Sequence, residues 1–243
     1  MQPLRRFLRN LLPDTLVRRL IRWRTAKFQR DMSGRPSDEI FAEIYKRGMW
    51  GGSASGNRFY SGHGSHMPDI VEPYFAAVGR FLEGFASLPD VVDLGCGDFA
   101  VGSRIRAKCR RYIACDIVPE LIEYNLQAFA DLDVDFRTLN LATDALASGD
   151  VAFVRQVMQH MSNAEISALI PKLRANYEYI VVTEQVPGGQ FEPNADKSPG
   201  ADIRISVNSG IVLTAPPFSL APVAEQVLCE VREGVTVVRT HLY

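Results

Sequence analysis

The sequence predicts an α/β fold with a doubly wound, mostly parallel sheet of seven strands and an antiparallel hairpin at its C-terminal end. Three observations support this prediction. Short apolar runs alternate with helix-patterned segments from residue 71 onwards, a glycine pair follows the first of these runs, and residues 224–243 divide into two strand-like runs. Strands that alternate with helices form right-handed crossovers and therefore a parallel sheet.

Each expected element has its own local pattern. Strands are expected over residues 90–94, 112–117, 134–141, 150–155 and 179–185. Helices are expected over residues 71–85, 101–110, 118–129 and 164–176. Glu233 and Gly234 are placed to turn the chain between the two final strands, which is simplest as a hairpin at one edge of the sheet. With 243 residues, of which 47% are hydrophobic, the chain is long enough for one such domain with additions.

The charge pattern divides the chain into three regions. Residues 1–30 contain nine of the 27 Lys and Arg residues but, at Asp14, only one of the 28 acidic residues. Apolar residues at helical spacing make this region a basic amphipathic arm, expected either to lie in an anionic membrane interface or to pack on the body or a second subunit. Residues 31–70 contain a helix and a Gly-rich lid, for which a flexible linker is the alternative. Residues 71–243 form the main domain.

The composition also indicates the compartment. No stretch approaches the roughly 20 apolar residues of a membrane span, and the N-terminal region has no unbroken apolar core of a secretory signal. The four cysteines form no Cys-x-x-Cys pair, which argues for free thiols rather than disulfides or a zinc site. We therefore expect a cytoplasmic protein, held at the inner membrane surface if the arm binds lipid.

The stretch "VVDLGCGDFAVGSRI", residues 91–105, contains the strongest local signal. Gly95 and Gly97 lie between the first strand and its helix, where glycine lets main-chain N–H groups approach a ligand closely. Asp116 closes the second strand and is well placed to bind the two hydroxyls of a ribose. A tight turn without a ligand is the alternative. The third glycine of the dinucleotide pattern is replaced by Ala100, which weakens the interpretation as a nicotinamide-dependent oxidoreductase.

The motifs together resemble a family. "VVDLGCGDFAVGSRI", "YIACDIVPELIEYN", "LNLATD", "DVAFVRQVMQHMS" and "YIVVTEQ" resemble the successive motifs of class I S-adenosylmethionine-dependent methyltransferases, over about residues 70–185. The resemblance implies a Rossmann-like fold and S-adenosylmethionine as the cofactor. With "IYKRGMWGGSASG", "SGHGS" and a late "PPF", the chain is also similar to bacterial methyltransferases associated with surface polysaccharides and glycans.

By this resemblance, Gly95 and Gly97 let the loop approach the methionyl part of the cofactor, and Asp93 orients its amino group through the loop or a water. Asp116 binds the ribose hydroxyls, and Ile117 lies against the adenine.

Two further positions are expected at the cofactor. Asn140 occupies a position where the family often has an acid for the adenine amino group; its amide oxygen can accept the same hydrogen bond, and a strand-end turn is the alternative. Arg155 follows the fourth strand and is expected to serve the cofactor and the chemistry, either by binding an acidic acceptor or only by pinning the loop.

A candidate general base follows in the same segment. Ser162 and Glu165 form a capping box, so a helix begins there and His160 lies in the loop before it. A neutral imidazole at this place can accept a proton from a hydroxyl acceptor. The alternative is a structural histidine that hydrogen-bonds the loop. His63 and His66 could instead supply the base or half of a metal site, but no set of carboxylates completes one, so no metal is expected.

Residues for the acceptor are expected in two loops. Trp50, Tyr60, Ser61 and His63 belong to the Gly-rich lid and would close over cofactor and acceptor. The long segment after the fifth strand contributes Arg204 and Asn208 as ligands for a sugar hydroxyl or carboxylate, and Phe218 as an apolar wall. The alternatives are a disordered lid and an ordinary surface loop.

The expected function is therefore S-adenosylmethionine-dependent O-methylation of a sugar hydroxyl in a glycan or glycolipid precursor. Two alternatives remain: N- or O-methylation of a soluble small metabolite, with the arm as an oligomer contact, and an inactive cofactor-binding scaffold. Nucleic acid is disfavoured as a partner because the body is acidic and no motif for a flipped base is present.

Overall fold

The protein is described by a computed structural model that covers residues 14–52 and 58–243. The chain divides into two compact units, Met1–Pro36 and Ser37–Tyr243. In the first unit, the helix α2 (Asp14–Asp31) corresponds to the second half of the basic arm, whereas the expected helical stretch at residues 4–12 lies outside the described residues. None of the described helices is long and apolar enough to cross a membrane.

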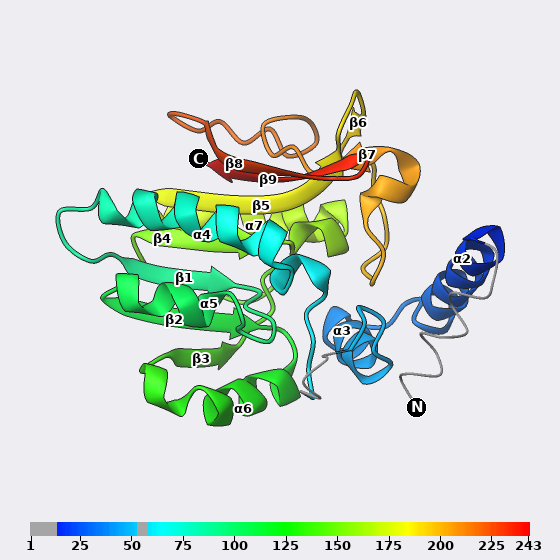
Figure 1. The fold of residues 1–243 in the computed structure, drawn as a ribbon, viewed down its shortest axis with the longest axis horizontal. Helices are drawn as coiled ribbons and strands as arrows, with labels where there is room; N and C mark the ends of the chain where they lie inside the picture. Colours follow the sequence, from blue (N-terminus) through cyan, green and yellow to red (C-terminus); the bar gives the residue numbers. More distant parts are fainter. Residues whose placement is uncertain (1–13, 53–57) are drawn as a thin grey trace. The chain divides into compact units, whose positions relative to one another are not determined.

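The second unit is built on a seven-stranded sheet with the order β3-β2-β1-β4-β5-β9-β8 (Figure 1). The strands are β1 (Asp90–Leu94), β2 (Arg111–Asp116), β3 (Asp135–Thr138), β4 (Val151–Arg155), β5 (Tyr179–Pro187), β8 (Gln226–Glu233) and β9 (Thr236–Leu242). The first five strands run parallel, and β9 pairs antiparallel with both β5 and β8. The predicted sheet and its terminal hairpin are confirmed.

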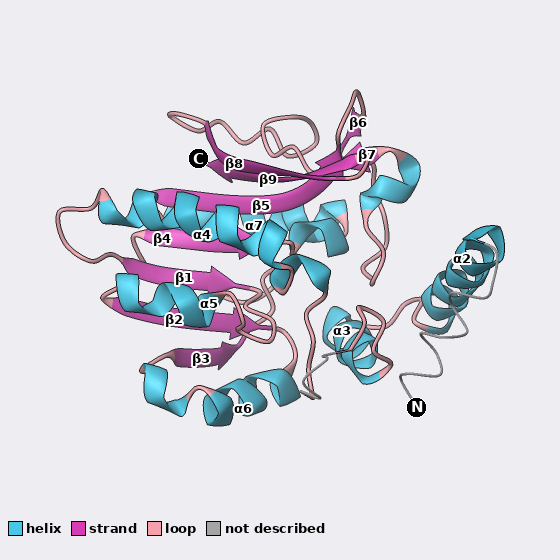
Figure 2. Ribbon diagram, viewed as in Figure 1, coloured by secondary structure: helices cyan, strands magenta, loops and turns pink. Residues whose placement is uncertain are grey.

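The helices follow the predicted alternation (Figure 2). They are α3 (Ser37–Lys46), α4 (Pro68–Glu83), α5 (Gly102–Ile105), α6 (Pro119–Ala128) and α7 (Asn163–Asn176). The helix expected over residues 101–110 is shorter than predicted, because after Ile105 the chain tightens into a 3-10 turn, Arg106–Lys108. The predicted capping box is present at the start of α7, where the Ser162 hydroxyl accepts from the main-chain N–H of Glu165.

Alternating residues of the central strands pack on opposite faces of the sheet. In β1, Val92 and Leu94 belong to an apolar cluster that contains Ile166 and Leu169 of α7. Val91 belongs to a second cluster, with Val78 and other residues of α4. A strand has a side-chain period of two, so burial on both faces requires the continuous apolar runs that the sequence shows. This double cover fixes the strands whose carboxyl ends carry the site.

The strand β3 is shorter than predicted. It ends at Thr138, because Asn140 begins a turn in which its main-chain carbonyl accepts from the N–H groups of Thr143 and Asp144. The long segment after β5 contains a small parallel pair, β6 (Glu192–Pro193) with β7 (Ser209–Gly210), which the sequence did not predict.

Candidate functional site

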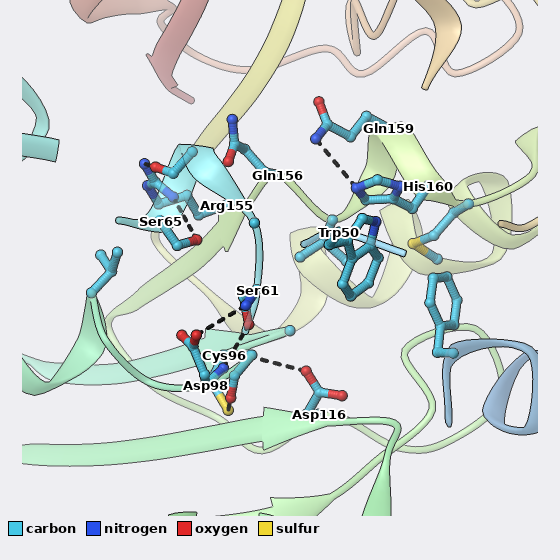
Figure 3. Close-up of a pocket in the computed structure, with 18 of the residues that line it drawn as sticks. Trp50, Ser61, Ser65, Cys96, Asp98, Asp116, Arg155, Gln156, Gln159 and His160 are labelled. Atoms are coloured by element: carbon cyan, nitrogen blue, oxygen red, sulfur yellow. Dashed lines mark hydrogen bonds between the residues drawn. The ribbon is translucent and has the colours of Figure 1, made fainter. Parts of the chain in front are cut away.

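A cavity of about 670 Å³ lies where the parallel strands end at their carboxyl termini. Its wall includes the glycine loop after β1, Asp116 at the end of β2, residues 155–157 after β4 and residues 61–65 of the Gly-rich region. Figure 3 shows Ser61, Cys96, Asp98 and Asp116 gathered in one part of the cavity, with Trp50 beside His160 in another. The cavity therefore has a carboxylate-rich end and an imidazole–indole end.

The glycine pair is required by two close approaches. Gly95 and Gly97 have φ angles of 85° and 57°, in the region that favours glycine. A Cβ atom at Gly95 would lie 2.4 Å from Cγ2 of Val157, and one at Gly97 would lie 2.4 Å from Oγ of Ser61. The close packing of Val157 and Ser61 against the loop therefore excludes a side chain at either glycine, even without a bound ligand.

Asp116 is held in place by main-chain donors. Its Oδ2 accepts from the N–H of Gly97 at 3.1 Å, and its Oδ1 accepts from the N–H of Val118 at 3.1 Å. Each oxygen keeps a second lone pair, and the residue lines the cavity together with Ile117. Burial raises the pKa of the Asp116 carboxyl to about 6, against the lowering effect of these N–H groups. Asp116 is therefore an oriented acceptor for a pair of hydroxyl groups.

Asp93 lies beneath the same loop. Its Oδ2 accepts from the hydroxyl of Tyr112 at 3.0 Å, and burial raises the pKa of the Asp93 carboxyl to about 7. Asn140 also lines the cavity, but its Oδ1 already accepts from the N–H of Ala142 at 2.9 Å. This contact fits the turn interpretation of Asn140, with one lone pair of the amide oxygen remaining.

Arg155 is directed to the Gly-rich segment. Its guanidinium donates to the carbonyl oxygen of Gly64 and, at 3.3 Å, to the hydroxyl of Ser65, and it lies 4.9 Å from the ring centre of Tyr74. Its buried Nε has no hydrogen-bond partner among the described residues. The arginine thus pins the loop through its terminal nitrogens, as the loop-pinning alternative expects.

His160 lies at the imidazole–indole end of the cavity. Its Nδ1 is 3.0 Å from the carbonyl oxygen of Gly200, and its ring centre is 5.1 Å from that of Trp50. Because a carbonyl can only accept, Nδ1 bears the proton and Nε2 has the lone pair. Burial, then the charge of Lys197, lowers the pKa of His160 to about 3, so the ring is neutral above that pH.

No protein-family model matches the chain, and no curated protein does either. Solved structures do match it. The DhpI complex with S-adenosylhomocysteine has a TM-score of 0.58 at 15% identity and covers 87% of this chain and 98% of its own. The N-methyltransferase NodS from Bradyrhizobium japonicum WM9, also with S-adenosylhomocysteine, has a TM-score of 0.59 at 12% identity and covers 84% and 97%.

A third structure is the N-terminal domain of EvdMO1 in the presence of S-adenosylhomocysteine and D-fucose. It has a TM-score of 0.51 at 16% identity and covers 82% of this chain and 94% of its own. The chain has the fold of the S-adenosylmethionine-dependent methyltransferases. Within this methyltransferase fold, the cavity lies at the carboxyl ends of the parallel strands, where open α/β sheets bind ligands.

Three expectations for the acceptor are wrong. Arg204 is 2% exposed and does not line the cavity. Its guanidinium donates to the main-chain carbonyls of residues 158, 159, 161 and 195 and to the side chain of Asn163. Asn208 is exposed and terminates a 3-10 turn in the left-handed conformation, away from the cavity. Phe218 is buried in the apolar core of the sheet.

The Gly-rich region is placed largely as expected. Trp50, Ser61 and His63 line the cavity, and the Trp50 indole N–H donates to the carbonyl of Ala201 at 3.4 Å. Tyr60 does not line it. Its ring stacks on His66 with a centroid distance of 4.4 Å, so it packs within the Gly-rich region and not against the cavity. Among the described residues, no group of three His, Cys, Asp or Glu side chains is placed to hold a metal ion.

Sequence reasoning missed Glu184 on β5. The side chain is 3% exposed, and its two oxygens accept from the N–H groups of Met158 at 2.9 Å and Gln159 at 3.1 Å. It therefore fixes the 3-10 turn that ends at His160. Burial raises the pKa of the Glu184 carboxyl to about 8. An acid inside the apolar run "YIVVTEQ" was the available signal, because a buried carboxylate needs partners.

Proposed function

We propose that the protein is an S-adenosylmethionine-dependent methyltransferase. The observation that carries this proposal is Asp116, oriented by the N–H groups of Gly97 and Val118 at the wall of a cavity in a methyltransferase fold. Its free lone pairs suit the two hydroxyls of a ribose. Bound S-adenosylmethionine supplies a methyl group activated by a sulfonium.

The charge of the cavity fits that cofactor. Of the described lining residues, six are acidic and Arg155 is the single Lys or Arg; the acids are Asp93, Asp98, Asp116, Glu165, Asp202 and Glu233. S-adenosylmethionine carries a net positive charge, so this wall favours it. The guanidinium of Arg155, which also lines the cavity, supplies the positive charge that suits the carboxylate of the same molecule. Ile117 and Asn140, which also line the cavity, would contact the adenine.

His160 is the group best placed to accept a proton. The contact of Nδ1 with the carbonyl of Gly200 leaves the lone pair on Nε2 of the imidazole ring. The amide nitrogen of Gln159 lies 3.4 Å from this ring nitrogen, a long contact. Its low pKa makes it a weak base that is always available in the neutral form, which suits a hydroxyl that loses its proton as the bond to the methyl carbon forms. Arg155 and Glu184 hold the segments around it by contacts to the main chain.

We propose a sugar hydroxyl of a glycan or glycolipid precursor as the acceptor. The lining of the cavity includes neutral amides, at Gln156 and Gln159, and the indole of Trp50, which together suit an uncharged polyhydroxy ring. The solved EvdMO1 domain with D-fucose shares this fold. A soluble small metabolite is the alternative acceptor, and an inactive scaffold is the alternative to an enzyme.

The cofactor is tested first, by calorimetric titration with S-adenosylmethionine and, separately, with NAD. We expect saturable binding of S-adenosylmethionine alone. Asp116→Ala should weaken it by about a hundredfold, because two hydrogen bonds to a charged group are lost. Asp131→Ala, a change of an exposed acid, is the matched control. Folded protein that fails to bind S-adenosylmethionine would refute the proposed function.

The acceptor is tested with a panel of sugars, nucleotide sugars and small amines, using methyl transfer from labelled S-adenosylmethionine. With a hydroxyl acceptor, His160→Ala should lower kcat by about 10²- to 10⁴-fold while leaving cofactor affinity within about threefold. His160→Gln keeps the approximate size of the ring without its basicity. Equal turnover in all three proteins would exclude His160 as the base.

We also propose that the basic arm binds an anionic membrane surface. Trp23 of α2 is 58% exposed, and nine basic residues lie within residues 1–30. Co-sedimentation with vesicles containing phosphatidylglycerol, but not with neutral vesicles, is expected and should weaken with salt. Replacing Arg18, Arg19 and Arg22 together by Gln should abolish it. Salt-independent binding to neutral vesicles would contradict the proposal.

A further inference from the structure

Residues 58–66, here called the lid segment, form part of the cavity wall. Its first residues are anchored by Phe59, which is buried against Val118 and Leu121 at the start of α6. Its last residues form a 3-10 turn, His63–Ser65, that leads into α4. The middle of the segment, at Ser61, has no apolar anchor of its own, so polar contacts must hold it.

Most of those contacts converge on Asp98, the residue after Gly97; in addition, Oγ of Ser61 lies 3.0 Å from the hydroxyl of Tyr45 on α3. Oδ2 of Asp98 accepts from the N–H of Ser61 at 2.9 Å and lies 2.6 Å from Nε2 of His66. In return, the N–H of Asp98 donates to Oγ of Ser61 at 2.7 Å. One carboxylate therefore ties together two points of the lid segment that are five residues apart in the sequence. Asp98 is buried, which strengthens each of these bonds.

The same loop orients Asp116. The N–H of Gly97 donates to Asp116, while its carbonyl accepts from Nδ2 of Asn125 at 2.8 Å. The peptide of Gly97 is thus fixed at both ends, and the next residue, Asp98, reaches out to the lid segment. In Figure 3 the Ser61–Asp98 bonds lie directly beside Cys96 of the glycine loop.

The far part of the lid segment meets the end of β4. Arg155 donates to Gly64 and Ser65, and a Cβ atom at Gly64 would lie 1.8 Å from Oε1 of Gln156. Residues at the carboxyl ends of β1 and β4 therefore hydrogen-bond to two different parts of the lid segment. Of these two sets of contacts, the one at Asp98 adjoins Gly97, whose N–H donates to Asp116 at the proposed ribose-binding position.

We infer that Asp98 is a positioning residue: through Ser61 and His66 it holds the lid segment against the glycine loop and so controls release of the cofactor. The inference rests on the proposed function for the identity of the ligand, but the contacts themselves do not depend on it. Asp98 lines the cavity and adds to its negative charge, but by this inference it is not a catalytic residue; it acts on release of the cofactor through the lid segment.

The ligand-dependent test measures dissociation of S-adenosylhomocysteine by stopped-flow fluorescence. The chain has two tryptophans, so Trp23→Phe leaves Trp50, which lines the cavity, as the sole reporter. In that background, Asp98→Ala and His66→Ala should each raise the dissociation rate constant on the order of tenfold or more, with association changed by less than about threefold. His66→Gln, which keeps a donor for Asp98, should restore most of the slow release. Asp131→Ala is the matched control.

A ligand-free test separates this inference from the proposed function. Hydrogen exchange in peptides covering residues 58–66 should become faster in Asp98→Ala and His66→Ala than in the parent and in His66→Gln, at unchanged melting temperature. Unchanged exchange and unchanged release in both alanine variants would overturn the inference while leaving the cofactor assignment intact. If the parent protein binds no S-adenosylhomocysteine, the proposed function fails and the exchange result alone decides the role of Asp98.

Discussion

The two ends of the cavity use charged side chains in opposite ways. At the carboxylate-rich end, Asp116 accepts hydrogen bonds from two main-chain N–H groups and still lines the cavity. At the imidazole–indole end, the buried charges of Arg204 and Glu184 are used on the protein itself, mostly on its main chain, and the neutral rings of His160 and Trp50 face the cavity. Charge at the first end is open to a ligand in the cavity, whereas charge at the second end holds the conformation of a loop.

The strongest way to break this distinction is to change the glycine loop. Gly95→Ala should lower affinity for S-adenosylmethionine more than about a hundredfold, because the added Cβ would lie 2.4 Å from Val157 at a φ of 85°. Gly189→Ala, where a Cβ would meet nothing within 4 Å, is the control. Calorimetric titration measures both. Equal affinities would show that the loop does not meet the cofactor.

Arg204 tests the opposite end. Arg204→Met should cost about 3 kcal/mol of the free energy of unfolding or more, because it leaves several buried carbonyls without donors. Denaturant unfolding measures this loss, with exposed Arg174→Met as the control. A stable variant that instead loses acceptor binding would return Arg204 to the role of a substrate ligand.

The buried acids sharpen the comparison. At pH 8, Asp93→Asn should leave the free energy of unfolding unchanged or raise it. The Asn side chain can still accept the hydrogen bond from the Tyr112 hydroxyl, and the substitution removes a buried charge. Glu184→Gln should lower the free energy of unfolding by about 2 kcal/mol, because one amide oxygen cannot accept both of the main-chain hydrogen bonds that the two carboxylate oxygens accept. Thermal unfolding at pH 8 and pH 5 compares them. The raised pKa of Asp93, about 7, means that its contribution to stability is present at low pH and lost as the pH rises through 7.

The smallest effect concerns binding of the cofactor. Because burial raises the pKa of Asp116 to about 6, affinity for S-adenosylmethionine should fall by about fivefold as the pH drops from 6 to 5 and the carboxylate takes up a proton. Asp116→Asn should bind weakly and lose this dependence. Calorimetric titration at pH 6 and pH 5 measures the affinity of the unchanged protein and of the variant. An affinity of the unchanged protein that does not depend on pH would contradict an ionised Asp116 as the ribose ligand.

Prediction from the sequence was successful where the signal is local. The order of strands and helices follows from apolar periodicity, and the glycine pair with Asp116 follows from spacing along two neighbouring strands. The carboxyl ends of parallel strands meet at one edge, so short motifs after β1 and β2 are brought together by topology alone. For the same reason His160, after β4, could be placed at the cavity.

Prediction failed where function depends on contacts distant in the sequence. From the sequence, Arg204 resembles a free ligand in a polar loop, and only the folded chain shows that it donates to carbonyls 45 and 46 residues away. The partnership of Asp98 with Ser61 joins segments 37 residues apart with no shared motif. Side-chain pairings of this kind arise from the path of two loops, which hydrophobic periodicity does not specify.

Gly97 has a consequence for how such sequences diverge. Its missing side chain makes room for Ser61 of the protein itself, at a distance that no Cβ could tolerate. A related chain with the same lid segment would need this glycine whether or not it bound a ligand, since Ser61 would otherwise be displaced. Retention of the glycine in a related sequence therefore records the architecture of this loop and does not by itself identify an enzyme.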